Sequence, residues 1–184
     1  MRRLASALGL LALLVWAPPA PAGQDDPRLG RLFEELQAAE SDTVGHAISQ
    51  KIWEIWTAHG DPHVDALMTV GIVAMSDGNL EKALTHFDMV VKRAPKFAEG
   101  WNKRATVYYM MGRYKDSIKD VERTLALEPR HYGAISGLGL IHLQLGDDKA
   151  ALADFERALE VNPRMPLIRL RVRELKEQLK GRAI

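Results

Sequence analysis

The sequence predicts an all-α solenoid in which three helical hairpins repeat, with an atypical helical hairpin before them and a capping helix after them. The first observation is a fixed sequence period, because Pro95, Pro129 and Pro163 are evenly spaced and Gly78, Gly112 and Gly146 have the same spacing. The second is that the apolar residues of each period follow helical spacing in two runs, which the glycine separates. The period is 34 residues, and a constant period of that length is typical of a repeat array. The units are 64–97, 98–131 and 132–165.

Residues 1–22 have the order of a secretory signal peptide. A basic start precedes the apolar run Leu8–Ala17, and Ala20 and Ala22 form an A-x-A pattern before Gly23. The apolar run is shorter than the roughly 18 residues that a membrane-spanning helix needs. We therefore expect cleavage after Ala22 and a periplasmic product, with an uncleaved N-terminal anchor as the alternative.

Charge and cysteine content limit the classes of partner. The chain carries 25 basic and 24 acidic side chains, and cleavage removes Arg2 and Arg3, which leaves 23 basic side chains against 24 acidic ones. This near-neutral balance does not favour nucleic acid as a partner. The chain has no cysteine, so an exported product has no disulfide and no cysteine for lipid attachment, and its stability must come from its core.

Residues 26–61 are predicted to form a helical hairpin ahead of the array. Its two helices are expected at Asp26–Glu40 and Thr43–His59. Trp53 and Trp56 fall near second-helix core positions of a degenerate unit, so we interpret both as core residues.

Each repeat unit is predicted to be a helix–turn–helix. A first apolar run of about fourteen residues ends at the glycine, where a left-handed backbone closes a helix at low cost. A second run stops before the proline, which cannot continue that helix but is tolerated near the start of the next one.

Small and bulky residues recur at fixed places in each unit. Small residues stand where the two helices must approach closely, at Gly71, Ala105 and Gly139 on the first helix and Ala83, Ser117 and Ala151 on the second. Bulky residues fill the spaces between them, at Leu67, Trp101, Ile135, Phe87, Val121 and Phe155. On these residues, 64–165 resembles the tetratricopeptide repeat family, whose pattern is W-x2-L-G-x2-Y, A-x3-F-x2-A and P. Arg104 and His142 depart from the pattern, and we expect each to be a structural polar group with a hydrogen-bond partner.

Residues 166–181 are predicted to form a capping helix. Ile168, Val172, Leu175 and Leu179 share one stripe, and the opposite face is basic. A polar outer face keeps the open end of a solenoid soluble. Residues 164–184 hold seven basic and two acidic side chains, so docking on an anionic membrane surface or an acidic partner is the alternative.

No catalytic or metal-binding motif is present. The chain has no H-E-x-x-H, no G-x-S-x-G, no glycine-rich phosphate loop and no cysteine nucleophile. His59 and His63 are separated by Gly60-Asp61-Pro62, which breaks the helix that would place them on one face, and zinc needs three or four converging ligands. We expect no enzymatic activity, no cofactor and no metal.

The resemblance implies a peptide-binding groove on the concave face of the solenoid. In the family this face is lined mainly by the first helix of each unit, at its positions two, five, nine, twelve and thirteen. The matching residues are Asp65, Met68, Ile72, Met75 and Ser76, then Glu99, Asn102, Thr106, Tyr109 and Met110, then Gly133, Ser136, Leu140, Leu143 and Gln144. The Lys/Asn/Arg set with which some family members clamp a C-terminal carboxylate is absent, since only Asn102 is of a suitable type.

The candidate peptide-contacting residues form an apolar, methionine-rich set: Met68, Ile72, Met75, Asn102, Thr106, Tyr109, Met110, Leu140 and Leu143. Methionine adapts to irregular apolar partners, and a helix laid in a groove presents such a surface. The sequence therefore predicts a non-enzymatic interaction module of the cell envelope that holds an apolar or amphipathic peptide segment.

Two alternatives stay open. The flanking helices of the chain could cover part of the groove, since large exposed apolar patches are uncommon on monomers. Alternatively, the basic C-terminal helix could make the protein a binder of the envelope surface or of anionic membranes. The identity of the protein or peptide partner and the oligomeric state are not fixed by the sequence.

Overall fold

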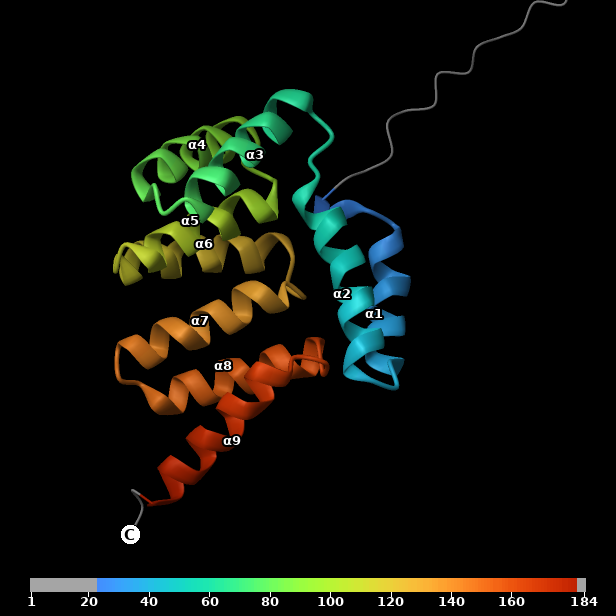
Figure 1. The fold of residues 1–184 in the computed structure, drawn as a ribbon, viewed down its shortest axis with the longest axis vertical. Helices are drawn as coiled ribbons and strands as arrows, with labels where there is room; N and C mark the ends of the chain where they lie inside the picture. Colours follow the sequence, from blue (N-terminus) through green and yellow to red (C-terminus); the bar gives the residue numbers. More distant parts are fainter. Residues whose placement is uncertain (1–22, 182–184) are drawn as a thin grey trace, which may run out of the picture.

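The computed structural model describes residues 23–181, and all regular elements in that range are helical (Figure 1). The short helix η1 (Gly23–Asp25) precedes α1 (Arg28–Ala38) and α2 (Asp42–Thr57). Three pairs follow, α3 (Pro62–Ser76) with α4 (Leu80–Arg93), α5 (Ala98–Met110) with α6 (Tyr114–Leu127) and α7 (Tyr132–Gln144) with α8 (Asp148–Val161), and α9 (Pro166–Gly181) ends the described chain. The predicted all-α solenoid of helical hairpins is confirmed. The expected signal peptide lies outside the described residues.

The recurring glycines close the three hairpins. Gly78, Gly112 and Gly146 have φ angles of 73°, 72° and 77°. This left-handed region costs an L-residue about 1–2 kcal/mol, a penalty that glycine avoids. The glycine turn therefore lets the second helix of each unit fold back against the first.

Close approach within a unit depends on the predicted small residues. A Cβ added to Gly71 would lie 2.6 Å from the ring of Phe87, and one added to Gly139 would lie 2.7 Å from the ring of Phe155. The aromatic ring of the second helix thus occupies the space that a side chain on the first helix would need.

The last helix continues the array as a cap. Val172 and Leu175 of α9 are buried, and they form one apolar cluster with Ala151 and Phe155 of α8. The opposite side of α9 faces solvent, as the predicted capping role requires.

The N-terminal hairpin (η1, α1 and α2) does not stack on α3 as a further unit. It lies beside the array and crosses the loops that join successive units (Figure 1). Gln24 Nε2 donates to Lys96 O at 2.6 Å in the first of these loops, and the Arg130 guanidinium of the second lies 4.4 Å from the ring centroid of Phe33.

At its other end, the hairpin is fixed to the loop between α8 and α9. Asn162 Nδ2 donates to Ser49 Oγ at 3.1 Å, and Arg164 donates to the carbonyl of Ala39. The hairpin thus holds both inter-unit loops and the loop before the capping helix. It therefore joins units that a simple solenoid would connect only through nearest neighbours.

Trp56 is a core residue as expected and Trp53 is partly buried against the same cluster, but both pack at the junction of the second and third units. Trp56 is buried and stacks on the ring of His131 with centroids 4.1 Å apart, and Trp53 meets Tyr132 edge-on at 5.8 Å. The hairpin therefore does not pack as a degenerate unit of the array, and the positions of the two tryptophans are set by their contacts with the loops. After α2 the chain turns at Gly60, whose φ is 89°, and this turn separates the direction of α2 from that of α3.

Candidate functional site

The predicted groove runs along α3, α5 and α7, and the N-terminal hairpin covers the end where these helices begin. The Asp65 carboxylate accepts the backbone N–H of His59 at 2.8 Å, just after α2. Glu99 is buried, and a Cβ added to Gly133 would lie 2.6 Å from the ring of Trp53. At this end, the groove is therefore covered by the flanking helices, as one of the two alternatives from the sequence expected.

A buried ionic cluster lies beneath the hairpin. His131 Nδ1 accepts the backbone N–H of Ala134 at 3.1 Å, so the ring proton is on Nε2, which donates to Glu99 Oε2 at 2.8 Å. Asn102 Nδ2 donates to the same oxygen at 2.9 Å, and Lys103 Nζ lies 3.0 Å from Glu99 Oε1. The spacing of the repeat could not reveal this cluster, because it depends on α2 covering it.

The environment of Glu99 keeps its carboxylate charged. Burial raises its pKa, but the charge of Lys103 and the hydrogen bond from His131 outweigh burial, so that the pKa lies below its usual value. The ammonium of Lys103 also lies 5.3 Å from the ring centroid of Trp53. These cationic and donor groups are therefore already engaged within the protein.

A pocket of about 170 Å³ opens between α5 and α7, beyond the covered end. It brings together four of the predicted groove residues, Asn102, Thr106, Tyr109 and Leu140. Gly133 and Ser136, which also occupy predicted lining positions, complete that side of the pocket, with Ala105, Ser117, Val121, Ala134, Gly137 and Ile141 as the remaining lining residues.

Gly137 is one of the lining residues that the sequence analysis missed, together with Ala134 and Ile141. A Cβ added there meets nothing within 4 Å, so this glycine leaves open space at the pocket wall. It lies inside a helix, where glycine costs roughly 1 kcal/mol relative to alanine. A glycine that carries this cost without a packing reason was the feature of the sequence that could have pointed to the pocket.

The other predicted groove residues do not reach this pocket. Met68 is 2% exposed in the core of the first unit, so the expectation that it contacts a partner is corrected. Ile72 and Met75 are half-buried against the same core, and Leu143 packs against the cluster between α8 and α9. Met110 is 48% exposed on α5.

Met68 is buried for a reason that the register alone could not supply. It shares an apolar cluster with Val64, at the start of its own unit, and Phe97, at the junction with the next unit. A shallow hollow at the same place is lined by Thr57 and Ala58 at the end of α2, together with Ile72.

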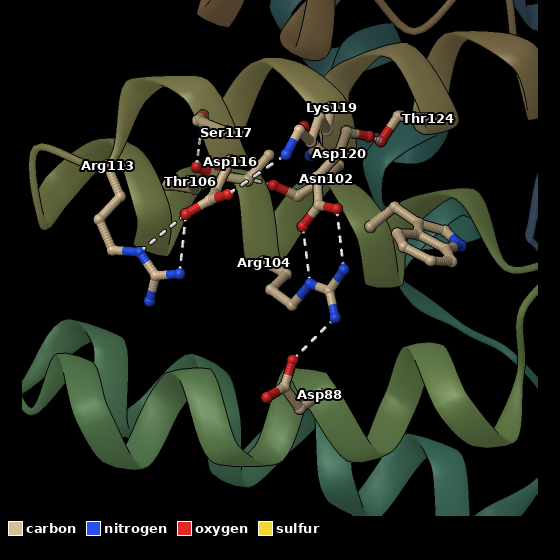
Figure 2. A network of polar contacts seen from close by, with 12 residues as sticks. Asp88, Asn102, Arg104, Thr106, Arg113, Asp116, Ser117, Lys119, Asp120 and Thr124 are labelled. Atoms are coloured by element: carbon tan, nitrogen blue, oxygen red, sulfur yellow. Dashed lines mark hydrogen bonds and ion pairs between the residues drawn. The ribbon is translucent and has the colours of Figure 1, made fainter.

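Arg104 is a structural polar residue, as expected. Its Nε and Nη2 donate to the two Asp120 carboxylate oxygens at 2.7 and 2.8 Å, and Nη1 donates to Asp88 at 2.7 Å (Figure 2). Its guanidinium carbon also lies 4.9 Å from the ring centroid of Trp101. Arg104 thereby links α4, α5 and α6, and all three nitrogens of its guanidinium are engaged by carboxylates of the array.

His142 is also structural, as expected. Its Nδ1 lies 2.7 Å from Asp154 Oδ2, in the third unit. Burial raises the pKa of Asp154, although the hydrogen bond with His142 lowers it in part. Among residues 23–181, no three His, Asp or Glu side chains converge in a group that could hold a metal ion.

The basic side chains of α9 are largely paired. Arg169 binds Asp42 of the N-terminal hairpin at 2.6 Å, and Lys176 binds Glu156 of α8 at 2.7 Å. Arg171 also pairs within α9 itself, 3.1 Å from a Glu174 oxygen. This pairing reduces the positive charge that α9 presents to an anionic surface. Within residues 23–181, none of the helices combines the length and the apolar content that a membrane span requires.

Comparison with known proteins agrees with the helical repeat. Two family models, each described as tetratricopeptide repeat, match residues 115–180 and 98–131. A TPR repeat-containing protein of Rhizobium etli is 33% identical over 154 residues, which cover 84% of this chain and 76% of that protein. The Hsp70-Hsp90 organizing protein of Triticum aestivum is 33% identical over 99 residues, which cover 54% of this chain and 17% of that protein.

Solved structures share the fold at low sequence identity. The first TPR domain of Spaghetti (RPAP3), bound to an HSP90 peptide, superposes with a TM-score of 0.61 at 20% identity, over 64% of this chain and 94% of that one. The Sgt2 TPR domain from Aspergillus fumigatus gives 0.62 at 23% identity, over 66% and 82%. With the repeat period, the hairpin geometry and the Rhizobium relative in agreement, the chain belongs to the tetratricopeptide repeat family.

Proposed function

We propose that this protein is a non-enzymatic interaction module of the cell envelope, which holds an apolar or amphipathic peptide segment in its concave groove. The observation that carries the proposal is the pocket between α5 and α7, which takes one anchor side chain of the peptide. A cavity of about 150 Å³ holds a molecule the size of benzene, so this pocket suits a leucine or phenylalanine side chain.

The chemistry of the pocket favours an uncharged anchor. Thr106 Oγ1 donates to Asn102 O at 2.9 Å, and Ser136 Oγ donates to Gly133 O at 3.0 Å, so both hydroxyl protons are already used. No ionised side chain lines the pocket. A charged anchor would lose its hydration without gaining a partner, at a cost of several kcal/mol.

Exposed apolar side chains extend the contact beyond the pocket. Leu140 is 36% exposed at the pocket, and Met110 stands on α5 directly after the pocket-lining Tyr109. The flexible thioether of methionine adapts to an irregular partner surface. We infer that the peptide continues across this part of α5.

Related proteins support peptide binding as the general role. The Spaghetti domain was solved with the HSP90 peptide SRMEEVD, and a TPR2B domain of yeast Sti1 was solved in complex with an Hsp70 peptide. In this chain Glu99 engages both Lys103 and His131, so these groups do not offer the positive charge that an acidic tail requires. This difference favours an apolar anchor over an acidic one.

The envelope location rests on residues 1–22, whose order is that of a secretory signal peptide. Export followed by cleavage after Ala22 would deliver the groove to the periplasm. Binding tests therefore use the chain that begins at Gly23.

Replacing Gly137 by leucine tests the pocket directly. The new side chain enters open space and fills the pocket, and removing a glycine from a helix adds up to about 1 kcal/mol of stability. Binding is measured by fluorescence anisotropy with labelled peptides that differ only in one anchor residue, Leu or Phe against Glu. We expect binding of the Leu and Phe peptides to the wild type and its loss in Gly137→Leu.

The matched control is Gly30→Leu on α1, where an added Cβ also meets nothing within 4 Å. This variant should bind like the wild type and melt no lower. Equal binding by Gly137→Leu, or a preference for the Glu peptide, would refute the assignment of the pocket. A lower melting temperature for Gly137→Leu would show that the space at Gly137 is not open.

A further inference from the structure

The first helix of each later unit carries a stripe of residues that packs against the preceding helix. In α5 this stacking stripe includes Gly100, Arg104 and Val107, and a Cβ added to Gly100 would lie 2.6 Å from Val90 of α4. Val107 is buried, and Arg104 reaches Asp88 of α4. The stripe is therefore the surface through which one unit stacks on the one before it.

The same register defines the stripe in the other helices. It includes Ala134, Leu138 and Ile141 in α7, and Ile168, Val172 and Leu175 in α9. Ala134, Ile141, Val172 and Leu175 are buried, and Leu138 and Ile168 pack against the same clusters. Every later stripe is thus covered by the helix before it.

In α3 the stripe is uncovered. Counting back one repeat period from α5 gives Ala66, Val70 and Val73, and the stripe extends to His63 and Asp77 at the two ends of the helix. Val70 is 38% exposed and Val73 is 54% exposed, and Ala66 is also exposed. The N-terminal hairpin, which precedes α3 in the chain, lies across the loops instead, so nothing within residues 23–181 replaces the missing helix (Figure 1).

We propose that the stacking stripe of α3 packs against the same stripe of a second copy of this chain, as an antiparallel helix pair with its two-fold axis at Val70. The stripe residues stand at 63, 66, 70, 73 and 77, and this alternation of three and four positions is the spacing of a helix–helix seam. A two-fold interface must be self-complementary. Here Val70 meets its own copy, and the small Ala66 meets the larger Val73.

The ends of the stripe are complementary in the same arrangement. Asp77 caps the C-terminal end of α3, where the dipole of its own helix disfavours a negative charge, and His63 stands in the first turn. In the antiparallel pair, Asp77 lies at the N-terminal end of the other helix, next to His63 of that copy. Arg93, which is half exposed, lies 3.7 Å from Asp61 at this end, so these two charges balance one another.

A single helix pair is a small interface, so the dimer should dissociate on dilution. Sedimentation velocity of the purified protein over a range of concentrations should show a dimer that gives way to a monomer. Val73→Glu places a charge in the seam and should abolish the dimer at concentrations where the wild type is dimeric. Val44→Glu on α2 is the matched control, because Val44 has a similar exposure of 47% outside the stripe, and it should leave the dimer unchanged.

Thiol cross-linking gives an independent readout of the geometry. The natural chain has no cysteine, so an introduced cysteine is its sole thiol. Val70→Cys, on the axis, should be joined to its copy by a short bis-maleimide reagent much faster than Val44→Cys. A protein that is monomeric at every concentration would overturn the proposal, and would leave the stripe to a helix of another protein. So would a dimer that survives Val73→Glu, or equal cross-linking of the two cysteine variants.

Discussion

Replacing Glu99 by glutamine should weaken the attachment of the N-terminal hairpin to the array. The Glu99 carboxylate is buried, and one of its oxygens accepts hydrogen bonds from His131 and Asn102 while the other faces Lys103. The amide oxygen of glutamine can still accept the two hydrogen bonds. Its amide nitrogen then faces the Lys103 ammonium, so a charge-assisted contact becomes a contact between two donors.

The size of the effect follows from that one lost contact. A hydrogen bond to a charged group contributes about 1.5–3 kcal/mol, and the side chain of Lys103 is 19% exposed, so water recovers part of the loss. We expect the free energy of unfolding to fall by about 2 kcal/mol at pH 7. For a chain of this size, that corresponds to a decrease in Tm of roughly 4–8 °C.

The pH dependence gives a second measurement. A carboxyl whose pKa is lower in the folded state stabilises the fold above its unfolded value, here 4.5, and that contribution is lost as the pH falls through the folded-state pKa. Urea unfolding between pH 3 and pH 7 should therefore show a steeper acid loss of stability for the wild type than for Glu99→Gln. The two proteins should converge at the acid end.

Glu174→Gln is the control, because Glu174 also forms an ion pair, with Arg171, but is exposed on α9. It should change the free energy of unfolding by less than about 1 kcal/mol. If Glu99→Gln were as stable as the wild type at pH 7, with an unchanged acid limb, the buried cluster would not be a source of stability and the reasoning would fail.

Two further changes test the packing of the array. Gly139→Ala should lower the free energy of unfolding by about 1–3 kcal/mol, because its Cβ meets the ring of Phe155 at 2.7 Å. In a thermal-melt double-mutant cycle with Phe155→Val, the combined loss should be smaller than the sum of the single losses. Strict additivity would contradict the close approach. Arg104→Lys should destabilise the array by about 1–3 kcal/mol in urea unfolding, because a lysine cannot bind Asp120 with two hydrogen bonds and Asp88 with a third. An unchanged urea midpoint would show that the contacts of Arg104 with Asp120 and Asp88 contribute little.

Much of the fold could be predicted from the sequence because the repeat encodes contacts between near neighbours. Gly71 and Phe87 belong to the two helices of one unit, and their partnership recurs at Gly139 and Phe155. A pattern that returns in every unit therefore shows both the helices and the faces through which they pack. The structural role of Arg104 followed from the same register.

The candidate site could be predicted only in part. The register placed Thr106, Tyr109 and Leu140 on one surface, and the structure brings them together at one pocket. It also placed Met68 there, but the packing of the first unit against the second buries that side chain. The same surface position is thus open in one unit and closed in another, because its exposure depends on what the neighbouring elements cover.

Local sequence patterns specify the helical repeat, the turns at Gly78, Gly112 and Gly146 and the faces of the helices, because each of these depends on contacts within one repeat unit. The tertiary structure alone decided where the N-terminal hairpin docks. Trp56 contacts His131, at the end of the second unit, although the whole first unit and nearly all of the second separate them in the sequence. It can do so because the stacked units bring their loops into one line (Figure 1). That surface exists only after the units have assembled, so no local pattern specifies it.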